Sequence, residues 1–137
     1  MPNLWKNLMK NKSPRISEGE WEIMNVIWSR TSCSAGETIE ALRQTDASWH
    51  PRTVKTFLHR LVKKRLLSFS KRGRAYLYLP LVWREECVDA AIESFLRRVF
   101  TGSFQSMLAY FIQRGKLSSH EIRELRRLLK QPINTHR

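Results

Sequence analysis

The spacing of apolar residues changes from a helical to a strand period near the middle of the chain, and this change limits the possible folds more than any other feature. In three stretches between residues 17 and 63, apolar side chains recur every three or four positions, as in amphipathic helices. Residues 66–70 and 75–79 instead alternate with a period of two, as in strands. We therefore predict three short helices followed by a two-stranded hairpin.

Local sequence signals predict where these elements begin and end. Ser17-Glu18-Gly19-Glu20 and Ser34-Ala35-Gly36-Glu37 each have the spacing of a capping box, in which the serine and the glutamate three positions later accept from free backbone N–H groups. The first helix then has Trp21, Met24, Ile27 and Trp28 on one face, and the second runs to about Gln44. Thr31-Ser32-Cys33 is a candidate minor strand, and Pro51 suits the first turn of the third helix.

The third helix combines a narrow apolar stripe with a wide basic face. Val54, Phe57, Leu58, Leu61 and Val62 form the stripe. The chain has 25 Lys and Arg residues against 12 Asp and Glu, and residues 48–80 hold nine of the basic residues and no acidic one. So strong a segregation of charge indicates a surface that contacts a polyanion. The candidate DNA-binding residues of this helix are Arg52, Thr53, Lys55, Thr56, His59, Arg60 and Lys63.

The hairpin continues the basic surface. Lys71-Arg72-Gly73-Arg74 joins its strands, with Tyr76 and Tyr78 on one face and Leu77 and Leu79 on the other. Three helices and a hairpin in this order are typical of a winged helix-turn-helix, whose third helix fits the major groove of double-stranded DNA. Lys71, Arg72 and Arg74 would then contact the DNA backbone or the minor groove. An alternative is that the basic helix packs on a protein partner or lies on anionic lipid.

Residues 82–130 predict three more helices with wide apolar faces. Gly102 and Gly115 separate them, and Ser118-Ser119-His120-Glu121 forms a third capping box. The last short helix cannot bury these apolar faces in a monomer of this size, so we expect a second copy of the chain as partner. The alternative is a compact monomer whose C-terminal helices fold back on the winged domain. The predicted dimerisation residues are Val88, Ile92, Phe95, Leu96, Val99, Phe104, Met107, Leu108, Phe111, Ile112, Leu125 and Leu128.

The sequence carries no pattern typical of an enzyme. Cys33 and Cys87 are far apart, and His50, His59, His120 and His136 form no close pair, so no metal site is expected. Nucleotide-binding glycine loops and nucleophile motifs are missing, and we expect no cofactor. No apolar run is long enough for a membrane span and no signal peptide is apparent, so we expect a cytoplasmic protein without membrane partners.

Two long motifs resemble those of the penicillinase-repressor family, which includes BlaI, MecI and CopY. They are the segments ISEGEWEIMNVIW (residues 16–28) and WHPRTVKTFLHRLVKK (residues 49–64), followed by Tyr76-Leu77-Tyr78. The resemblance covers residues 16–130. It implies a homodimeric winged-helix repressor on inverted-repeat operators, with the dimer formed by the C-terminal helices. It places Arg52, Thr53, Lys55, Thr56 and Arg60 at recognition positions.

The same resemblance bears on how repression is relieved. Antibiotic-resistance members are cleaved by a protease at an Asn-Phe bond in the C-terminal helices; here Tyr110 stands in place of the Asn, so Tyr110-Phe111 is the candidate cleavage site. Copper-responsive members carry C-x-C motifs near the C-terminus, and residues 130–137 contain no Cys. His50 replaces the serine that caps the recognition helix in other members.

Together, these features predict a mainly α protein with a small β-hairpin: a winged helix-turn-helix domain followed by a helical dimerisation domain. The expected divisions are a basic extension at residues 1–15, the DNA-binding domain at 16–80, the dimerisation domain at 81–130 and a tail at 131–137. The predicted function is sequence-specific repression by a homodimer. The alternative is an adaptor that binds nucleic acid without sequence preference and grips another protein with its C-terminal helices.

Overall fold

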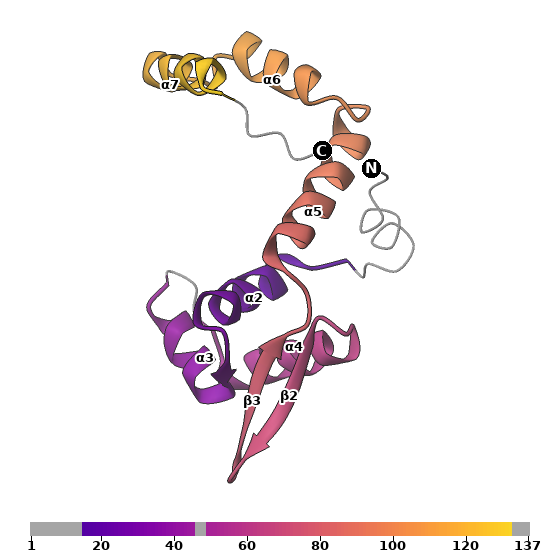
Figure 1. The fold of residues 1–137 in the computed structure, drawn as a ribbon. Coiled ribbons are helices and arrows are strands. Elements are labelled where there is room, and N and C mark those ends of the chain that lie inside the picture. The colour runs from indigo at the N-terminus through magenta and orange to yellow at the C-terminus, as the bar shows by residue number, and fades with distance from the viewer. Residues whose placement is uncertain (1–14, 46–48, 133–137) are drawn as a thin grey trace. The chain divides into compact units, whose positions relative to one another are not determined.

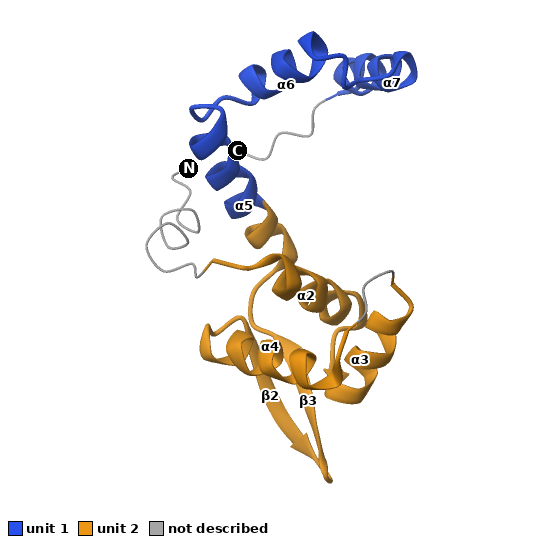
Figure 2. Cartoon of the chain, turned by 180° about the vertical axis from the view of Figure 1, so that it is seen from behind, with its two compact units in different colours: residues 1–4, 89–137 blue, residues 5–88 orange. Residues whose placement is uncertain are grey.

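The computed structural model describes residues 15–45 and 49–132. The described residues up to Val88 form one compact unit, and those from Asp89 onward form a second (Figure 2). Apart from Arg15, the predicted basic extension lies outside the described residues, as does the tail from residue 133. The fold is mainly helical with one small antiparallel sheet, which confirms the predicted fold class (Figure 1).

The first two helices begin where their capping boxes predicted. Helix α2 (Glu18–Arg30) is capped by Ser17, whose hydroxyl accepts from the Glu20 N–H, and Glu20 in turn accepts from the Ser17 N–H at 2.8 Å. Ser34 and Glu37 make the same reciprocal pair at the start of α3 (Ala35–Arg43). The minor strand β1 (Cys33–Ser34) lies between these helices.

Helix α4 (Pro51–Lys63) ends in a turn that leads directly into the hairpin. The Leu66 N–H donates to the Leu61 carbonyl and the Arg65 N–H to the Val62 carbonyl, the two bonds of a Schellman motif. This motif needs a left-handed residue after the helix, and Arg65 supplies it with φ +65°. The hairpin is therefore fixed immediately beside the end of α4.

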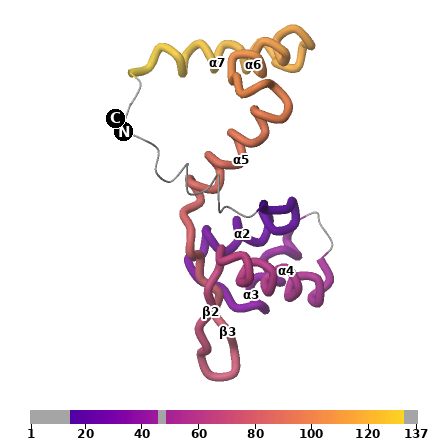
Figure 3. The backbone as a smooth tube through the Cα atoms, turned by 90° about the vertical axis from the view of Figure 1, so that its right-hand side faces the viewer, coloured from indigo at the N-terminus to yellow at the C-terminus, as the bar shows by residue number. Residues whose placement is uncertain are grey.

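The sheet has the strand order β1-β3-β2, with all neighbours antiparallel. Strands β2 (Leu67–Arg72) and β3 (Ala75–Pro80) pair along their whole length and extend away from helices α2 to α4 (Figure 3). Strand β1 pairs with β3 near the root of the hairpin, through Cys33 opposite Tyr78. The Leu81 N–H donates to the Leu66 carbonyl at 2.9 Å and closes the root.

One apolar core holds this unit together. It is formed by side chains from all three helices, from β1 and β2, and from the first turn of α5, and their burial is the main source of stability for a unit of this size. The buried members are Ile23, Met24, Ile27, Cys33, Ile39, Leu42, Val54, Leu58, Leu61, Leu66, Leu67 and Cys87.

The C-terminal part of the chain is a succession of three helices. They are α5 (Arg84–Val99), α6 (Phe104–Gln113) and α7 (Ser119–Lys130). Gly102 and Gly115 lie between them with positive φ, and Ser118 and Glu121 form the third capping box. In the described part of the chain, no helix is both long and apolar enough to cross a membrane.

The structure differs from the sequence prediction in three details. Both strands are longer than expected, so that Lys71 and Arg72 belong to β2 and only Gly73 and Arg74 form the turn. Helix α5 begins at Arg84 rather than near Val82. In α2, Ile23 is fully buried although the predicted apolar face did not include it, whereas Trp21 and Trp28 of that face are half-buried against the core.

Candidate DNA interface

Helix α4 is anchored by one face and leaves the other free. Val54, Leu58 and Leu61 are fully buried, whereas Phe57 and Val62 are half-buried at the edges of the stripe. His50 caps the helix, because its Nδ1 atom accepts from the Arg52 N–H at 3.1 Å. The anchoring places the predicted recognition residues together on the exposed side, which we call the basic face: Arg52, Thr53, Lys55, Thr56, His59, Arg60 and Lys63, all of them exposed.

Two side chains of the basic face are already held in place. The Thr56 hydroxyl donates to the Arg52 carbonyl at 3.0 Å, so its proton is used within the helix. The methyl group of this exposed side chain suits apolar contact with a thymine methyl. The Arg60 guanidinium lies 5.4 Å from the centre of the Phe57 ring, close enough for a cation–π contact.

The hairpin presents a second basic group, the wing tip, formed by Lys71, Arg72 and Arg74, which are all exposed. Gly73 has φ +62° at the first position of the two-residue turn, a backbone conformation that glycine adopts without strain. Below the tip, the Phe69 and Tyr76 rings meet edge to face with centres 5.2 Å apart. Cross-strand aromatic contacts of this kind stiffen a hairpin that extends into solvent.

A buried carboxylate is paired with the cation that ends α4. Glu20 is 1% exposed, and its Oε1 atom accepts from Lys64 Nζ at 2.7 Å. Burial raises the pKa of Glu20, but the hydrogen bonds from Lys64 and Ser17 and the charge of Lys64 outweigh it, and the net pKa lies below its ordinary value. We call this the Glu20–Lys64 clamp, and it ties the start of α2 to the end of α4.

Sequence patterns did not reveal the clamp, since its partners lie 44 positions apart. The exposed aromatic pair Phe69 and Tyr76 was missed as well, although the period of two in the strands placed Tyr76 on the face that Phe69 shares. Both features support the interface: the clamp fixes the base of α4, and the pair supports the wing.

The predicted dimerisation residues fall on α5, α6 and α7 and differ widely in exposure. Leu96 is buried, and Val88, Met107, Leu108, Phe111 and Leu125 are half-buried. The candidate cleavage site Tyr110-Phe111 lies inside α6. The other predicted residues leave 41–57% of their surfaces uncovered in the single chain: Ile92, Phe95, Val99, Phe104, Ile112 and Leu128.

The His, Cys, Asp and Glu side chains of the described residues are the candidate ligands for a metal ion, and the two cysteines are the candidate reactive thiols. No group of three or more His, Cys, Asp or Glu side chains there is arranged to hold a metal ion. Both cysteines are buried; burial raises the pKa of Cys33, and burial together with Glu86 raises the pKa of Cys87 to about 11. A thiol with a raised pKa is a poor nucleophile and a poor metal ligand at neutral pH.

Comparison with known proteins identifies the family. Residues 16–131 match the model of the penicillinase repressor family. The penicillinase repressor of Bacillus licheniformis is 37% identical over 123 residues, which cover 90% of this chain and 95% of the relative. The methicillin resistance regulatory protein MecI of Mammaliicoccus sciuri is 35% identical over 123 residues, which cover 90% of this chain and 99% of the relative.

Among solved structures, the chain is similar to the monomeric form of Bacillus licheniformis BlaI in complex with the blaP half-operator. The identity is 40%, the match covers 53% of this chain and 88% of the other, and the TM-score is 0.47. The family match and the two relatives cover nearly the whole chain. The chain therefore belongs to the penicillinase repressor family and is a winged-helix, DNA-binding transcriptional repressor of the BlaI/MecI type, not an enzyme.

Proposed function

We propose that the protein represses transcription as a homodimer that binds an inverted-repeat operator and inserts one α4 helix into the major groove of each half-site. The observation that carries this proposal is the basic face of α4: seven exposed side chains that bear cations, hydroxyls and one imidazole, with no carboxylate among them. An α-helix of this length fits the major groove of B-form DNA, where each base pair presents a distinct pattern of donors and acceptors.

The two basic groups have different roles in this proposal. In this proposal Arg52, in the first turn of α4, contacts a base edge, because the N-terminal residues of a recognition helix contact the bases in the groove. Lys55 and Arg60 follow on the same exposed side. The wing tip contacts phosphates, which fixes the position of the protein but carries little sequence information.

The exposed apolar side chains of the C-terminal helices support the homodimer. Phe95 and Phe104 leave 41% and 57% of their surfaces uncovered, and Ile112 leaves 53%. Monomeric proteins seldom expose so many large apolar side chains in one short segment. A second copy is the simplest partner, since a two-fold protein axis matches the two-fold symmetry of an inverted repeat.

Relief of repression by proteolysis requires an opening of helix α6. The Tyr110-Phe111 bond lies within this helix, and a protease acts on extended backbone. Local unfolding of α6 would expose the bond, and dimerisation through the same helix would oppose that unfolding. Cleavage here would remove α7 and part of the proposed dimer contact.

Selection of duplex DNA from a random pool tests the proposal. We expect the selected sequences to share an inverted repeat, and sedimentation of the complex to give two protein chains per repeat. Selected DNA without a common motif, or a complex with one chain, would contradict the homodimeric repressor. It would favour instead the adaptor that binds nucleic acid without sequence preference.

A further inference from the structure

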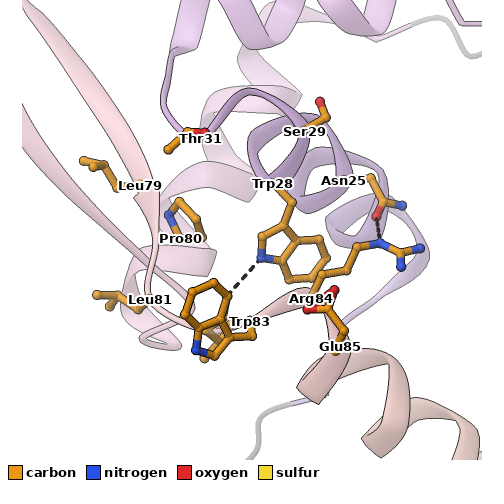
Figure 4. Close-up of a pocket in the computed structure, with 11 residues that line it drawn as sticks. Asn25, Trp28, Ser29, Thr31, Leu79, Pro80, Leu81, Trp83, Arg84 and Glu85 are labelled. Carbon is orange, nitrogen blue, oxygen red and sulfur yellow. Dashed lines mark hydrogen bonds between the residues drawn. The ribbon is translucent and has the colours of Figure 1, made fainter. Parts of the chain in front are cut away.

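A cavity of about 700 Å³ lies at the C-terminal end of α2, where the chain passes from β3 into α5 (Figure 4). This volume lies within the range of about 300–1,000 Å³ that is usual for small-molecule sites. DNA binding and dimerisation as proposed above make no use of it. The residues that line it are Asn25, Trp28, Ser29, Thr31, Leu79, Pro80, Leu81, Val82, Trp83, Arg84 and Glu85.

Aromatic and aliphatic side chains make up most of the wall. Both Trp28 and Trp83 line the cavity, and Trp83 leaves 73% of its surface exposed. Leu81, on the same segment, is 56% exposed. Large apolar side chains exposed around a cavity are typical of a binding site, and indole rings favour a flat aromatic partner.

Two opposite charges stand at the rim. Arg84 Nε donates to Asn25 Oδ1 at 3.3 Å, which orients the guanidinium and leaves its terminal nitrogens available. Glu85 follows directly on the same first turn of α5. In the part of the chain that the structure describes, no ion pair joins these two side chains to each other. A ligand with both a negative and a positive group would complement them, since a guanidinium pairs well with a carboxylate.

We propose that this cavity binds a small aromatic compound that carries a carboxylate and an ammonium group, the chemical class of the aromatic amino acids. The ring packs against Trp28 and Trp83. The carboxylate binds Arg84, with the Asn25 amide beside it, and the ammonium binds Glu85.

The site is placed to influence repression, and this part of the proposal rests on the proposed function. Trp28 Nε1 donates to the Val82 carbonyl at 3.0 Å and so ties the segment after β3 to α2. A bound ligand contacts the same segment, from which α5 continues into the predicted dimerisation residues. In this proposal the ligand binds one conformation of the segment between β3 and α5 more tightly than others. Because that segment joins the DNA-binding unit to the predicted dimerisation residues, ligand binding alters the affinity of the dimer for its operator.

Three related probes test the ligand chemistry: phenylalanine, 3-phenylpropionate, which lacks the ammonium, and phenethylamine, which lacks the carboxylate. Binding to the full-length protein is followed by ligand-observed NMR titration without DNA. We expect saturable binding of phenylalanine and about tenfold weaker binding of each of the other two, because each lacks one charge-assisted hydrogen bond. No saturable binding, or equal binding of all three, would overturn the site.

Matched variants locate the binding. Trp83→Ala should weaken binding of all three probes. Arg84→Gln should make phenylalanine bind no more tightly than phenethylamine, which lacks the carboxylate. Glu85→Gln should make phenylalanine bind no more tightly than 3-phenylpropionate, which lacks the ammonium. Since all three side chains are exposed, these changes should leave the fold intact. Leu129→Ala and Arg97→Gln are the controls, exposed positions that neither line the cavity nor belong to the predicted dimerisation residues. Equally weakened binding in the controls would show binding elsewhere and overturn the assignment.

The regulatory part is measured separately, as operator affinity with and without saturating phenylalanine. A change in the wild type that Trp83→Ala abolishes supports regulation, and an unchanged affinity overturns it while the ligand site stands. If the probes bind as predicted and no DNA sequence is preferred, the proposed function fails and the ligand site remains. If Trp83→Ala changes the oligomeric state and phenylalanine does not bind, the cavity is a contact between chains and the ligand proposal is wrong.

Discussion

Arg52 and Arg72 carry the same charge on different elements, which makes them a matched pair of probes for the interface. Arg52 lies in the first turn of α4, and Arg72 at the end of β2 beside the hairpin turn. Arg52→Ala should weaken binding to the selected operator by about 1–3 kcal/mol and affect a scrambled duplex much less. Arg72→Ala should weaken both alike and lower the salt slope by about 0.9 for each phosphate that the wing no longer neutralises.

Fluorescence anisotropy titrations of both duplexes at several salt concentrations measure these effects. Arg72→Ala leaves the basic face of α4 unchanged and is the control for Arg52→Ala. Arg52→Ala leaves the wing tip unchanged and is the control for Arg72→Ala. If Arg52→Ala bound the operator as the wild type does, the basic face of α4 would not be the surface that distinguishes sequences.

The Glu20–Lys64 clamp gives the stability of the N-terminal unit a dependence on pH. The pKa of Glu20 is lowered from its ordinary value of 4.5, so the ionised carboxylate stabilises the folded state above that value. The stabilisation is lost as the pH falls through the lower pKa of the folded protein. Glu20→Gln should lower the free energy of unfolding at pH 7 by about 1–3 kcal/mol, and the difference from the wild type should shrink below about pH 4.

Chemical denaturation between pH 3 and pH 7 checks the clamp. Glu124→Gln is the matched control, because Glu124 pairs with Arg127 at 3.0 Å on an exposed helix face, where such a pair contributes less than about 1 kcal/mol. Equal effects of the two substitutions at pH 7 would show that burial of Glu20 does not strengthen its pairing.

At the scale of elements, the end of α4 stores backbone strain that can be relieved. Arg65 has φ +65°, a conformation that costs a residue with a side chain about 1 kcal/mol relative to glycine. Arg65→Gly should therefore stabilise the protein by about that amount, measured by thermal unfolding. Arg74→Gly is the control, since Arg74 lacks a positive φ; this change should leave stability unchanged or lower it. Destabilisation by Arg65→Gly would show that the Arg65 side chain makes a contact worth more than the strain.

Elements defined by local signals were predictable from the sequence. The starts of α2, α3 and α7 follow from hydroxyl and carboxylate side chains three positions apart, and the observed bonds are the ones expected. The lengths of the strands were less predictable. The pairs Lys71–Tyr76 and Arg72–Ala75 form between the two strands, and the sequence of one strand alone does not indicate them. The basic face of α4 followed from helical period and charge.

The remaining features depend on contacts between distant residues. Apolar period placed Trp21 and Trp28 on the apolar face of α2 and left out Ile23, but Ile23 is fully buried in the structure and the two tryptophans are half-buried. A helix face is wide enough to allow either choice, and only packing against α3 and α4 decides between them. The cavity beside Trp28 was not predictable, since its walls come from residues 25–31 and 79–85.

At the scale of the whole molecule, the C-terminal helices should determine how many chains bind DNA. Ile112 on α6 is 53% exposed, and placing a charge there would be costly in an apolar interface. Ile112→Asp should shift the protein to a monomer in sedimentation experiments. It should also reduce operator affinity by more than about tenfold, because one dimer no longer binds both half-sites at once. Gln113→Asp, at the adjacent exposed position, is the control. A dimer that survives Ile112→Asp would exclude this part of α6 from the interface.

The most direct test of the proposed dimeric repressor changes the distance between the half-sites of the selected operator. Two α4 helices related by a two-fold axis can enter the major groove together only when the half-sites face the same side of the DNA. Inserting about five base pairs, half a helical turn, should abolish cooperative binding of two chains and leave only weak binding to single half-sites. Binding of two chains with unchanged affinity after this insertion would contradict the proposal that a symmetric dimer recognises an inverted repeat.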